Sequence, residues 1–421
     1  MSVNNGHVSG NERLIIGLVS GSSVDGIDAG LVSIDGTCEN SALKLRHFVS
    51  VPFDAATRRQ LLDLFHYETA TIDKIVVAHA IMGELFSEAA LQVAAESGTP
   101  MSKVDAIGVW GQMMYHRPAH VAPFEWRGKQ LGGNLQCCDV SRIALRTGVT
   151  TVGDVAAGDL ADGGNGAPFT AVFDYAMYHH PRQNRVVQNF GGIGNCNLLP
   201  ATGDVTSVVG FDTGPGNMVI DELVRQYTGG AEHFDRDGER AARGRVSDTL
   251  LQELLQEPFI QAKPPKAAGR EQYGAHFAHQ ILQRGEELGL APDDVVATAT
   301  ALTAEAVALN YRRHLLPIAP IDEVIVGGGG ALNKTLLRML RDRLGCTIST
   351  HEDHGNPSDA IETMVMAFIA NETSLGHTNH VPRHTGGTHS TFMGLIAPGK
   401  SWQRNPARFA QSAEVESAVR V

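Results

Sequence analysis

Residues 15–28 read IIGLVSGSSVDGID, and residues 186–195 read VVQNFGGIGN. Each stretch places a turn of small and polar residues after an apolar run, a pattern typical of a strand, a tight turn and a second strand. Glycine lets the backbone approach a ligand closely, and N–H groups in such turns can bind phosphate oxygens. Either hairpin alone could be an ordinary turn, but the pair predicts a nucleotide phosphate chain held from both sides, and so phosphoryl transfer.

Composition limits the function classes. The 421 residues are enough for two domains, and 43% hydrophobic with 19% charged residues is typical of a soluble globular protein. A net charge of −12 disfavours nucleic-acid binding. We find neither an apolar signal core at the N-terminus nor an apolar run approaching the roughly 20 residues that span a bilayer, so we expect a cytoplasmic protein. The five cysteines form no C-x-x-C pair, which argues against a disulfide framework and a zinc site.

Strand-like runs and helical periodicity alternate along the chain, which predicts an α/β fold. Because the second hairpin restarts the pattern of the first, we expect two related domains with a cleft between them. We place domain I at 12–183 plus 360–398, domain II at 184–359, and tails at 1–11 and 399–421.

Four further expectations concern single elements. The longest helices are expected at 71–97 and 292–315, where apolar residues recur at three- and four-residue steps. A strand is expected at 206–211, and an irregular loop at 116–134.

Residues 210–217, GFDTGPGN, follow an apolar run and open a predicted helix. An acid at a strand end in a glycine-rich turn tends to point into a cleft, where a general base or a metal-binding carboxylate belongs. Asp212 is therefore a candidate for this chemistry. Bracing of the turn or capping of the helix is the alternative.

Three more segments carry polar or glycine-rich signals. The acids Asp154, Asp159 and Asp162 lie in a glycine-rich loop that can hold sugar hydroxyls or hydrated Mg²⁺, although a capping role is favoured for Asp162. Residues 324–333, VIVGGGGALN, lack the ending of a P-loop, and indicate close backbone approach to a base ring or an α-phosphate, or a tight turn. Glu362 either binds a hydroxyl or completes a capping box at a helix start.

Together these segments resemble the anhydro-N-acetylmuramic acid kinase family, which includes the fungal levoglucosan kinases. The resemblance runs from about residue 13 to 398. Its motifs are SGSSVDG at 20–26, GGNGAP at 163–168, NFGGIGN at 189–195, FDTGPGN at 211–217, HFDRDG at 233–238 and PKAAGRE at 265–271.

The resemblance implies an actin-like, sugar-kinase-type α/β fold with two domains around an ATP cleft. It implies that water cleaves a 1,6-anhydro bridge while oxygen 6 receives the γ-phosphoryl group of ATP, with Asp212 as the base that activates the water. ATP and Mg²⁺ are the implied cofactors and a small sugar is the implied substrate. No nucleic-acid or membrane partner is expected, and a homodimer is left open.

The motifs and the resemblance together give the expected site residues, with no residue assigned to a metal. Asp212 is the expected catalytic residue. The expected ATP-binding residues are Gly21, Ser22, Ser23, Asp25, Gly26, Asn189, Gly191, Gly192, Asn195, Gly214, Gly216, Asn217, Lys266, Gly269, Gly328, Gly329 and Asn333. The expected sugar-binding residues are Gln112, Asp154, Asp159 and Glu362.

The chain departs from the family's pattern at several polar positions. The family's Asp-Phe-Arg reads Asp154-Val155-Ala156, so the arginine is missing. Other family polar groups are replaced by Trp110, Met113, Ala267 and Ala268. We therefore expect a preference for a neutral anhydro sugar of the levoglucosan type. The alternative function is a catalytically weak or inactive nucleotide-binding member that acts as a sensor or partner-binding protein.

Overall fold

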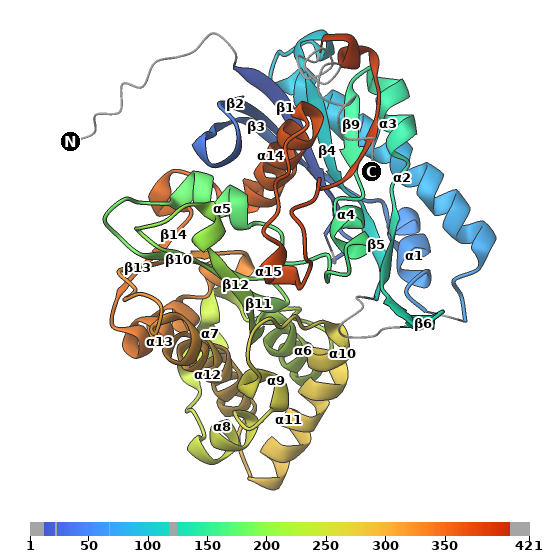
Figure 1. Ribbon diagram of the computed structural model, residues 1–421. Coiled ribbons are helices and arrows are strands. Elements are labelled where there is room, and N and C mark those ends of the chain that lie inside the picture. The colour runs from blue at the N-terminus through green and yellow to red at the C-terminus, as the bar shows by residue number, and fades with distance from the viewer. Residues whose placement is uncertain (1–11, 22, 67, 118–123, 405–421) are drawn as a thin grey trace. The chain divides into compact units, whose positions relative to one another are not determined.

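The structure, a computed structural model, describes residues 12–404 except 22, 67 and 118–123 (Figure 1). The chain divides into two compact units. Unit 1 comprises Met1–Met177 and Ala360–Val421, and unit 2 comprises Tyr178–Asp359. Each unit contains one main β-sheet with helices, so the predicted α/β class is confirmed.

Unit 1 has a six-stranded sheet in the order β15-β9-β4-β1-β2-β3. Strands β1 to β3 are antiparallel neighbours, β4 and β9 run parallel to β1, and β15 is antiparallel to β9. The strands are β1 Arg13–Val19, β2 Gly26–Asp35, β3 Ala42–Pro52, β4 Ala106–Trp110, β9 Thr150–Gly153 and β15 Leu395–Ala397. The helices are α1 Ala55–Asp63, α2 Ile72–Glu96, α3 Val140–Thr147, α4 Ala157–Ala161, α5 Ala171–Tyr178, α14 Ile361–Leu375 and α15 Pro382–Thr385.

Two glycines let helix α14 lie directly on this sheet. A Cβ on Gly17 would lie 1.7 Å from the carbonyl oxygen of Thr363, and a Cβ on Gly108 would lie 2.0 Å from that of Met366. Since successive strand residues face opposite sides, Ile16 on β1 faces away from α14 into the opposite core. The packing on glycine fixes α14, whose first turn carries Glu362.

Helix α2 packs on that opposite face. It is the one described helix that is long and apolar enough to cross a membrane by length and composition, a feature that the sequence analysis did not identify. Met82, Phe86 and Val93 are fully buried in the same core cluster as Ile16 and Leu18. These contacts make α2 a core helix of unit 1.

Unit 2 repeats the sheet pattern with five strands in the order β12-β11-β10-β13-β14. Strands β10 to β12 are antiparallel neighbours, and β13 and β14 continue the sheet in parallel. The strands are β10 Arg185–Phe190, β11 Ile193–Leu199, β12 Val209–Pro215, β13 Glu323–Gly327 and β14 Thr347–Thr350. The helices are α6 Asn217–Tyr227, α7 Glu239–Arg243, α8 Asp248–Leu254, α9 Pro258–Gln261, α10 Arg270–Tyr273, α11 Ala275–Glu287, α12 Pro292–Asn310 and α13 Lys334–Leu344.

In both units the order of the main strands, counted along the chain, is third, second, first, fourth, fifth. This repeated order is that of the actin-like sugar-kinase fold, so the predicted fold class is confirmed. The boundary between the units lies after Met177 and again after Asp359, whereas the sequence analysis placed the first boundary after residue 183.

One local prediction was wrong, and two differ from the structure only in the bounds or the type of the element. The irregular loop expected at 116–134 contains strands in its described residues, because β5 Gln112–Arg117 pairs with β8 Gly133–Cys137, and β6 Phe124–Trp126 with β7 Lys129–Leu131. These short strands expose much of their surface, so they lack an apolar pattern. The strand expected at 206–211 begins at Val209, after a 3₁₀ turn. Helix α12 ends at Asn310 and continues as a single π-helical turn, Tyr311–Leu315.

Candidate active site

Four residues form one row across the sheet of unit 2. Three of them are predicted site residues, and the fourth, Gly327, precedes the predicted Gly328 in the chain. Asp212 on β12 pairs with Asn195 on β11, Asn195 pairs with Asn189 on β10, and Asn189 pairs with Gly327 on β13. Paired residues present their side chains on the same face of a sheet. With neighbouring strands about 4.8 Å apart, the row extends about 14 Å. The register thus brings three distant motifs together.

The turn between β10 and β11 is docked on the start of helix α6. The carbonyl oxygen of Gly191 accepts from Asn217 N at 2.8 Å, and that of Gly192 accepts from Gly216 N at 3.0 Å. The Asn217 side chain donates to the carbonyl oxygen of Phe190 at 2.9 Å. A Cβ on Gly216 would lie 2.5 Å from Gly191 O, so this docking requires glycine at 216.

The glycines of the site have different roles. A Cβ on Gly191 would meet its nearest neighbouring atom at 3.9 Å, so the space beside this residue is open to a ligand. Gly328 instead has φ +70, and its Cβ would lie 2.5 Å from Asn189 Oδ1. Gly214, with φ +135, also requires glycine for its backbone angle. Of these three glycines, Gly191 is therefore the one with open space beside it.

The Asp212 carboxylate is buried at the edge strand of the sheet. Its Oδ2 accepts from Ala268 N at 2.8 Å, and its own N–H donates to Lys266 O at 3.1 Å. Burial raises the pKa of Asp212 to about 7, although the Ala268 N–H and the Lys266 charge act in the opposite direction. A carboxyl group with a pKa near 7 is suited to act as a general base at neutral pH.

Lys266, an expected ATP-binding residue, makes its described contacts within unit 2. Its ammonium donates to the carbonyl oxygens of Phe259 at 2.9 Å and Ile260 at 3.4 Å, and lies 4.8 Å from the centre of the Phe259 ring. The residue is 7% exposed, and burial lowers its pKa to about 8. These internal contacts make Lys266 a positioning residue, because its anchored segment supplies the backbone groups beside Asp212.

Asn333, another expected ATP-binding residue, also has a structural contact. Its side-chain oxygen caps helix α13 by accepting from Leu336 N at 2.9 Å. Gly269 lies directly before helix α10 in the anchored segment, and Gly329 begins the 3₁₀ turn that leads to Asn333.

A buried polar network that the sequence analysis missed supports the same strands from the other face. Asn310 Nδ2 donates to Thr213 O at 3.1 Å, and Gln188 Nε2 donates to Thr213 Oγ1 at 3.3 Å. Tyr311 OH donates to Gln188 Oε1 at 2.9 Å, at the π-helical turn. Since Thr213 and Gln188 immediately neighbour Asp212 and Asn189, this network fixes the backbone behind the row.

His351 is another residue whose position the sequence did not reveal. A Cβ on Gly327 would lie 2.2 Å from His351 Nε2, so this imidazole fills the end of the row. The ring also hydrogen-bonds to Tyr178 OH through Nδ1 at 2.7 Å, and burial lowers its pKa to about 4. His351 is therefore neutral at physiological pH.

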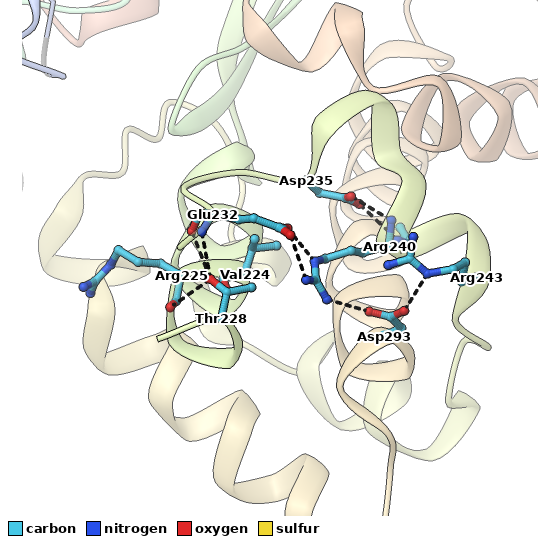
Figure 2. A network of polar contacts seen from close by, with 9 residues as sticks. Val224, Arg225, Thr228, Glu232, Asp235, Arg240, Arg243 and Asp293 are labelled. Carbon is cyan, nitrogen blue, oxygen red and sulfur yellow. Dashed lines mark hydrogen bonds and ion pairs between the residues drawn. The ribbon is translucent and has the colours of Figure 1, made fainter. Parts of the chain in front are cut away.

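The HFDRDG segment, residues 233–238, lies between helices α6 and α7, and Figure 2 shows its Asp235 within a network of polar contacts. Asp235 accepts from the backbone N–H groups of Arg240 at 2.8 Å and Ala241 at 3.0 Å. The Arg240 guanidinium bridges Glu232 at 2.8 Å and Asp293 at 3.1 Å, and so links α7 to the first turn of α12. This motif thus has a structural role within unit 2.

In unit 1, the turn between β1 and β2 is held by Gln112. The fully buried Gln112 accepts from Ser20 Oγ at 2.8 Å and donates to Gly21 O at 3.2 Å. Ser23 Oγ donates to the exposed Asp25 carboxylate at 2.8 Å. Gln112 therefore positions this turn. Ser22 lies outside the described residues.

Gly26 begins β2 beside β3, where a Cβ would lie 2.5 Å from Val51 O. This close backbone approach requires glycine at position 26, whatever ligand the turn binds.

The remaining sugar-binding candidates differ in availability. Asp154 directly follows β9, has a backbone φ of 51°, and accepts a hydrogen bond from Asn134 Nδ2 at 3.1 Å. The Glu362 side chain, in the first turn of α14, is exposed. Asp159 is fully buried and accepts from Gly166 N at 2.6 Å and Thr385 Oγ1 at 2.6 Å. Asp159 Oδ1 also lies 2.9 Å from His380 Nε2. Asp159 thus braces the loop internally.

Asp162 braces this loop as well, but it is not the N-cap that was expected, because it stands at the C-cap position of α4. Its carboxylate accepts from His389 N at 2.7 Å and Thr388 Oγ1 at 2.9 Å.

Comparison with known proteins identifies the family. The family model for anhydro-N-acetylmuramic acid kinase matches residues 13–399. The chain belongs to this family. It is 41% identical over 387 residues to an anhydro-N-acetylmuramic acid kinase from Caldanaerobacter subterraneus subsp. tengcongensis, with 92% of this chain and 97% of that protein covered. A Bacillus cereus member is 37% identical over 385 residues, with coverage of 91% and 98%. Members of this family are ATP-dependent phosphotransferases.

Two solved structures are more distantly similar. An activator of 2-hydroxyisocaproyl-CoA dehydratase from Clostridium difficile with bound ADPNP has a TM-score of 0.39 and 11% identity, covering 85% of this chain and 94% of that one. A ROK-family glucokinase from Streptomyces griseus in complex with glucose and AMPPNP has a TM-score of 0.33 and 14% identity, covering 85% and 99%.

The raised pKa of Asp212 predicts how stability depends on pH. Because the folded pKa, about 7, exceeds the unfolded value of about 3.9, the folded state binds the extra proton between these values, and stability falls as pH rises through this window. Asp212→Asn removes the buried charge and keeps an oxygen for Ala268 N–H. We expect a higher melting temperature than in the parent at pH 8 and a smaller difference at pH 5.

Asp204→Asn is the matched control for this measurement. Asp204 is exposed, and its pKa is lowered by hydrogen bonds from Thr206, so this substitution should not stabilise the protein at pH 8. If Asp212→Asn raises the melting temperature equally at pH 5 and pH 8, burial does not raise the pKa of Asp212 as inferred.

Proposed function

We propose that this chain is an ATP-dependent kinase of a 1,6-anhydro sugar, which opens the anhydro bridge with water and phosphorylates oxygen 6. The observation that carries the proposal is the row in unit 2, where a buried carboxylate with a pKa near 7 shares one sheet face with the asparagines of an open glycine turn. Family membership supports the same reaction class.

The chemistry follows from the bond that must be broken. A 1,6-anhydro sugar has no free 6-hydroxyl group that a base could deprotonate. Asp212 instead accepts a proton from water as the water oxygen bonds to the anomeric carbon and the bond from that carbon to oxygen 6 breaks. Oxygen 6 then attacks the γ-phosphorus, and ADP leaves. One carboxylate thus serves a reaction that couples hydrolysis to phosphoryl transfer.

Unit 2 supplies the nucleotide side in this proposal. The open space at Gly191 allows a phosphate group to reach backbone N–H groups, and the turn is already fixed by its docking on α6. The side-chain carbonyl oxygens of Asn189 and Asn195 are of the ligand type that Mg²⁺ accepts, which leaves the Asp212 carboxylate free to act as the base. When bound with ATP, Mg²⁺ neutralises charge on the phosphate oxygens.

Unit 1 supplies the sugar side. The parallel strands β1, β4 and β9 bring the 20–26 turn, Gln112 and Asp154 to one edge of its sheet. We propose Asp154 and the exposed Glu362 as direct hydroxyl ligands. We assign Gln112 and Asp159 to positioning, because their side chains are buried and already hydrogen-bonded within the unit.

The catalytic role is tested by Asp212→Asn. Asparagine keeps the shape of the side chain but cannot accept the proton from water, so kcat should fall by roughly 10²–10⁴-fold while ATP affinity changes little. In the parent, kcat/KM should rise with pH up to about 7 and then level. The measurements are steady-state kinetics and calorimetric ATP titration, with Asp204→Asn as the control. Turnover within a few-fold of the parent would remove Asp212 from this role.

The phosphate turn is tested by Gly191→Ala and Gly191→Val. Gly191 has open space for a side chain, so both variants should fold, and the larger valine should weaken ATP binding more than alanine does. Sugar affinity should stay nearly constant in both variants. Calorimetry that finds unchanged ATP affinity in folded Gly191→Val would exclude this turn from phosphate binding.

The substrate class is tested by comparing kcat/KM for levoglucosan and for anhydro-N-acetylmuramic acid at saturating ATP and Mg²⁺. Ala156, which replaces the family's arginine, is fully buried and offers no charge. Loss of one charge-assisted contact to a substrate carboxylate costs about 1.5–3 kcal/mol, so the neutral sugar should be favoured roughly 10- to 150-fold. Equal or higher efficiency on the muramic acid would reverse this assignment. Activity on neither sugar would support the nucleotide-binding sensor instead.

A further inference from the structure

Three potential metal ligands meet in unit 1, outside the proposed sugar and nucleotide residues. They are Cys38 Sγ, Glu372 Oε2 and His377 Nδ1, which lie within 4.8 Å of one another. Glu372 Oε2 is 3.3 Å from Cys38 Sγ and 3.0 Å from His377 Nδ1. One thiol, one carboxylate and one imidazole therefore converge on a single point.

The cluster lies far from Glu362 along the same helix. Glu372 is ten residues further along α14, which corresponds to about 15 Å of helix. Cys38 opens the 3₁₀ turn between β2 and β3, and His377 follows Gly376, which ends α14 with φ 82. The cluster thus lies at the opposite end of α14 from Glu362, the proposed sugar ligand on this helix.

Local hydrogen bonds orient the buried carboxylate. The Glu372 side chain is 0% exposed, and Asn371 Nδ2 donates to its Oε1 at 2.8 Å. Cys38 N donates to Oε2 at 3.0 Å, and His377 N donates to the Glu372 carbonyl oxygen at 3.0 Å. The hydrogen bond from Asn371 to Oε1 directs Oε2 toward the thiol and the imidazole. The hydrogen bond from His377 N to the Glu372 carbonyl oxygen fixes the backbone from which the His377 side chain projects.

We propose that Cys38, Glu372 and His377 bind one Zn²⁺ ion, with water as the fourth ligand. Tetrahedral zinc with bonds of about 2.3 Å to sulfur and 2.0–2.1 Å to nitrogen and oxygen places ligand atoms about 3.3–3.6 Å apart. The observed separations from Glu372 Oε2 differ from these by a few tenths of an ångström. A mixed thiolate, imidazole and carboxylate set suits zinc better than Mg²⁺ or Ca²⁺.

Binding exchanges hydrogen bonds for metal bonds. The Cys38 thiol loses its proton to solvent as sulfur bonds to zinc, and neutral His377 uses the lone pair of Nδ1. The His377 side chain is 39% exposed, so the ion can enter from this side and the imidazole can rotate. The Asn371 contact remains and orients the carboxylate.

This ligand set was not visible in the cysteine spacing, which argued against a zinc site. Cys38 and Glu372 are 334 residues apart, and the set has only one cysteine. Only the fold, which packs α14 on the sheet that contains β2 and β3, brings them together.

The test uses the full-length, chelator-treated protein without nucleotide. Titration with Co²⁺ should give a thiolate-to-cobalt charge-transfer band that saturates at one ion per chain and disappears when Zn²⁺ is added. Zn²⁺ should also raise the melting temperature by a few degrees. Cys38→Ser should lose the band and the thermal shift, and His377→Gln should weaken binding at least tenfold. Cys346→Ser, which changes a half-buried cysteine in unit 2, should behave like the parent.

Several results would overturn the proposal. If the parent protein shows no charge-transfer band with Co²⁺, the three side chains form hydrogen bonds with one another but bind no metal ion. A band that survives Cys38→Ser, or that is lost in Cys346→Ser, assigns the metal to another cysteine. If Cys38→Ser fails to fold, His377→Gln decides, because its half-exposed side chain can change with little effect on the core, and unchanged affinity in this variant excludes the three-ligand site.

Discussion

The site of unit 2 depends on one constraint, the hydrogen-bonded register of β12, β11 and β10. This register places Asp212, Asn195 and Asn189 side by side, although Asp212 lies on β12, outside the hairpin of β10 and β11 that carries the two asparagines. The alternation of strand residues then gives the two faces different tasks. One face presents the row, and the other receives Thr213 and Gln188 into the network of Asn310 and Tyr311. A shift of one residue would exchange the two faces.

The sequence predicted the elements of this site because their signals are local. A glycine-rich turn between apolar runs predicts a hairpin at 186–198, and the pairing of β10 with β11 confirms it. Asp212 was expected at the end of a strand, whereas the structure places it within β12 and buries its side chain, because the strand extends to Pro215. The sequence could not predict the register, since pairing is a long-range property. It also missed His351, because a histidine in a polar loop gives no sign that it will fill the space above Gly327. The β5–β8 pair was missed because its strands are short and their buried residues include the polar Gln112 and Gln136, so no apolar alternation marks them in the sequence.

The same limit explains why some polar residues were expected to bind ligands but have internal roles. Lys266, Gln112 and Asp159 occur in motifs where a charged or polar group could face a substrate. In the structure each is buried and its hydrogen bonds are made within its own unit. A buried polar group must be paired, whatever its motif. Sequence motifs therefore indicate which residues a site needs. Only the packing of the folded chain shows which of their side chains are available to a ligand and which hold a loop in place.

Asp212 shows that stability and chemistry place opposite demands on the same atoms. Burial raises its pKa to about 7, which makes the carboxylate a stronger base and also makes its charged form costly to bury. The Ala268 N–H and the anchored Lys266 reduce that cost without removing it. A pocket with more hydrogen bonds to the carboxylate would be more stable and would hold a weaker base. The limited pairing of Asp212 is therefore what suits this carboxylate to its proposed role as the general base.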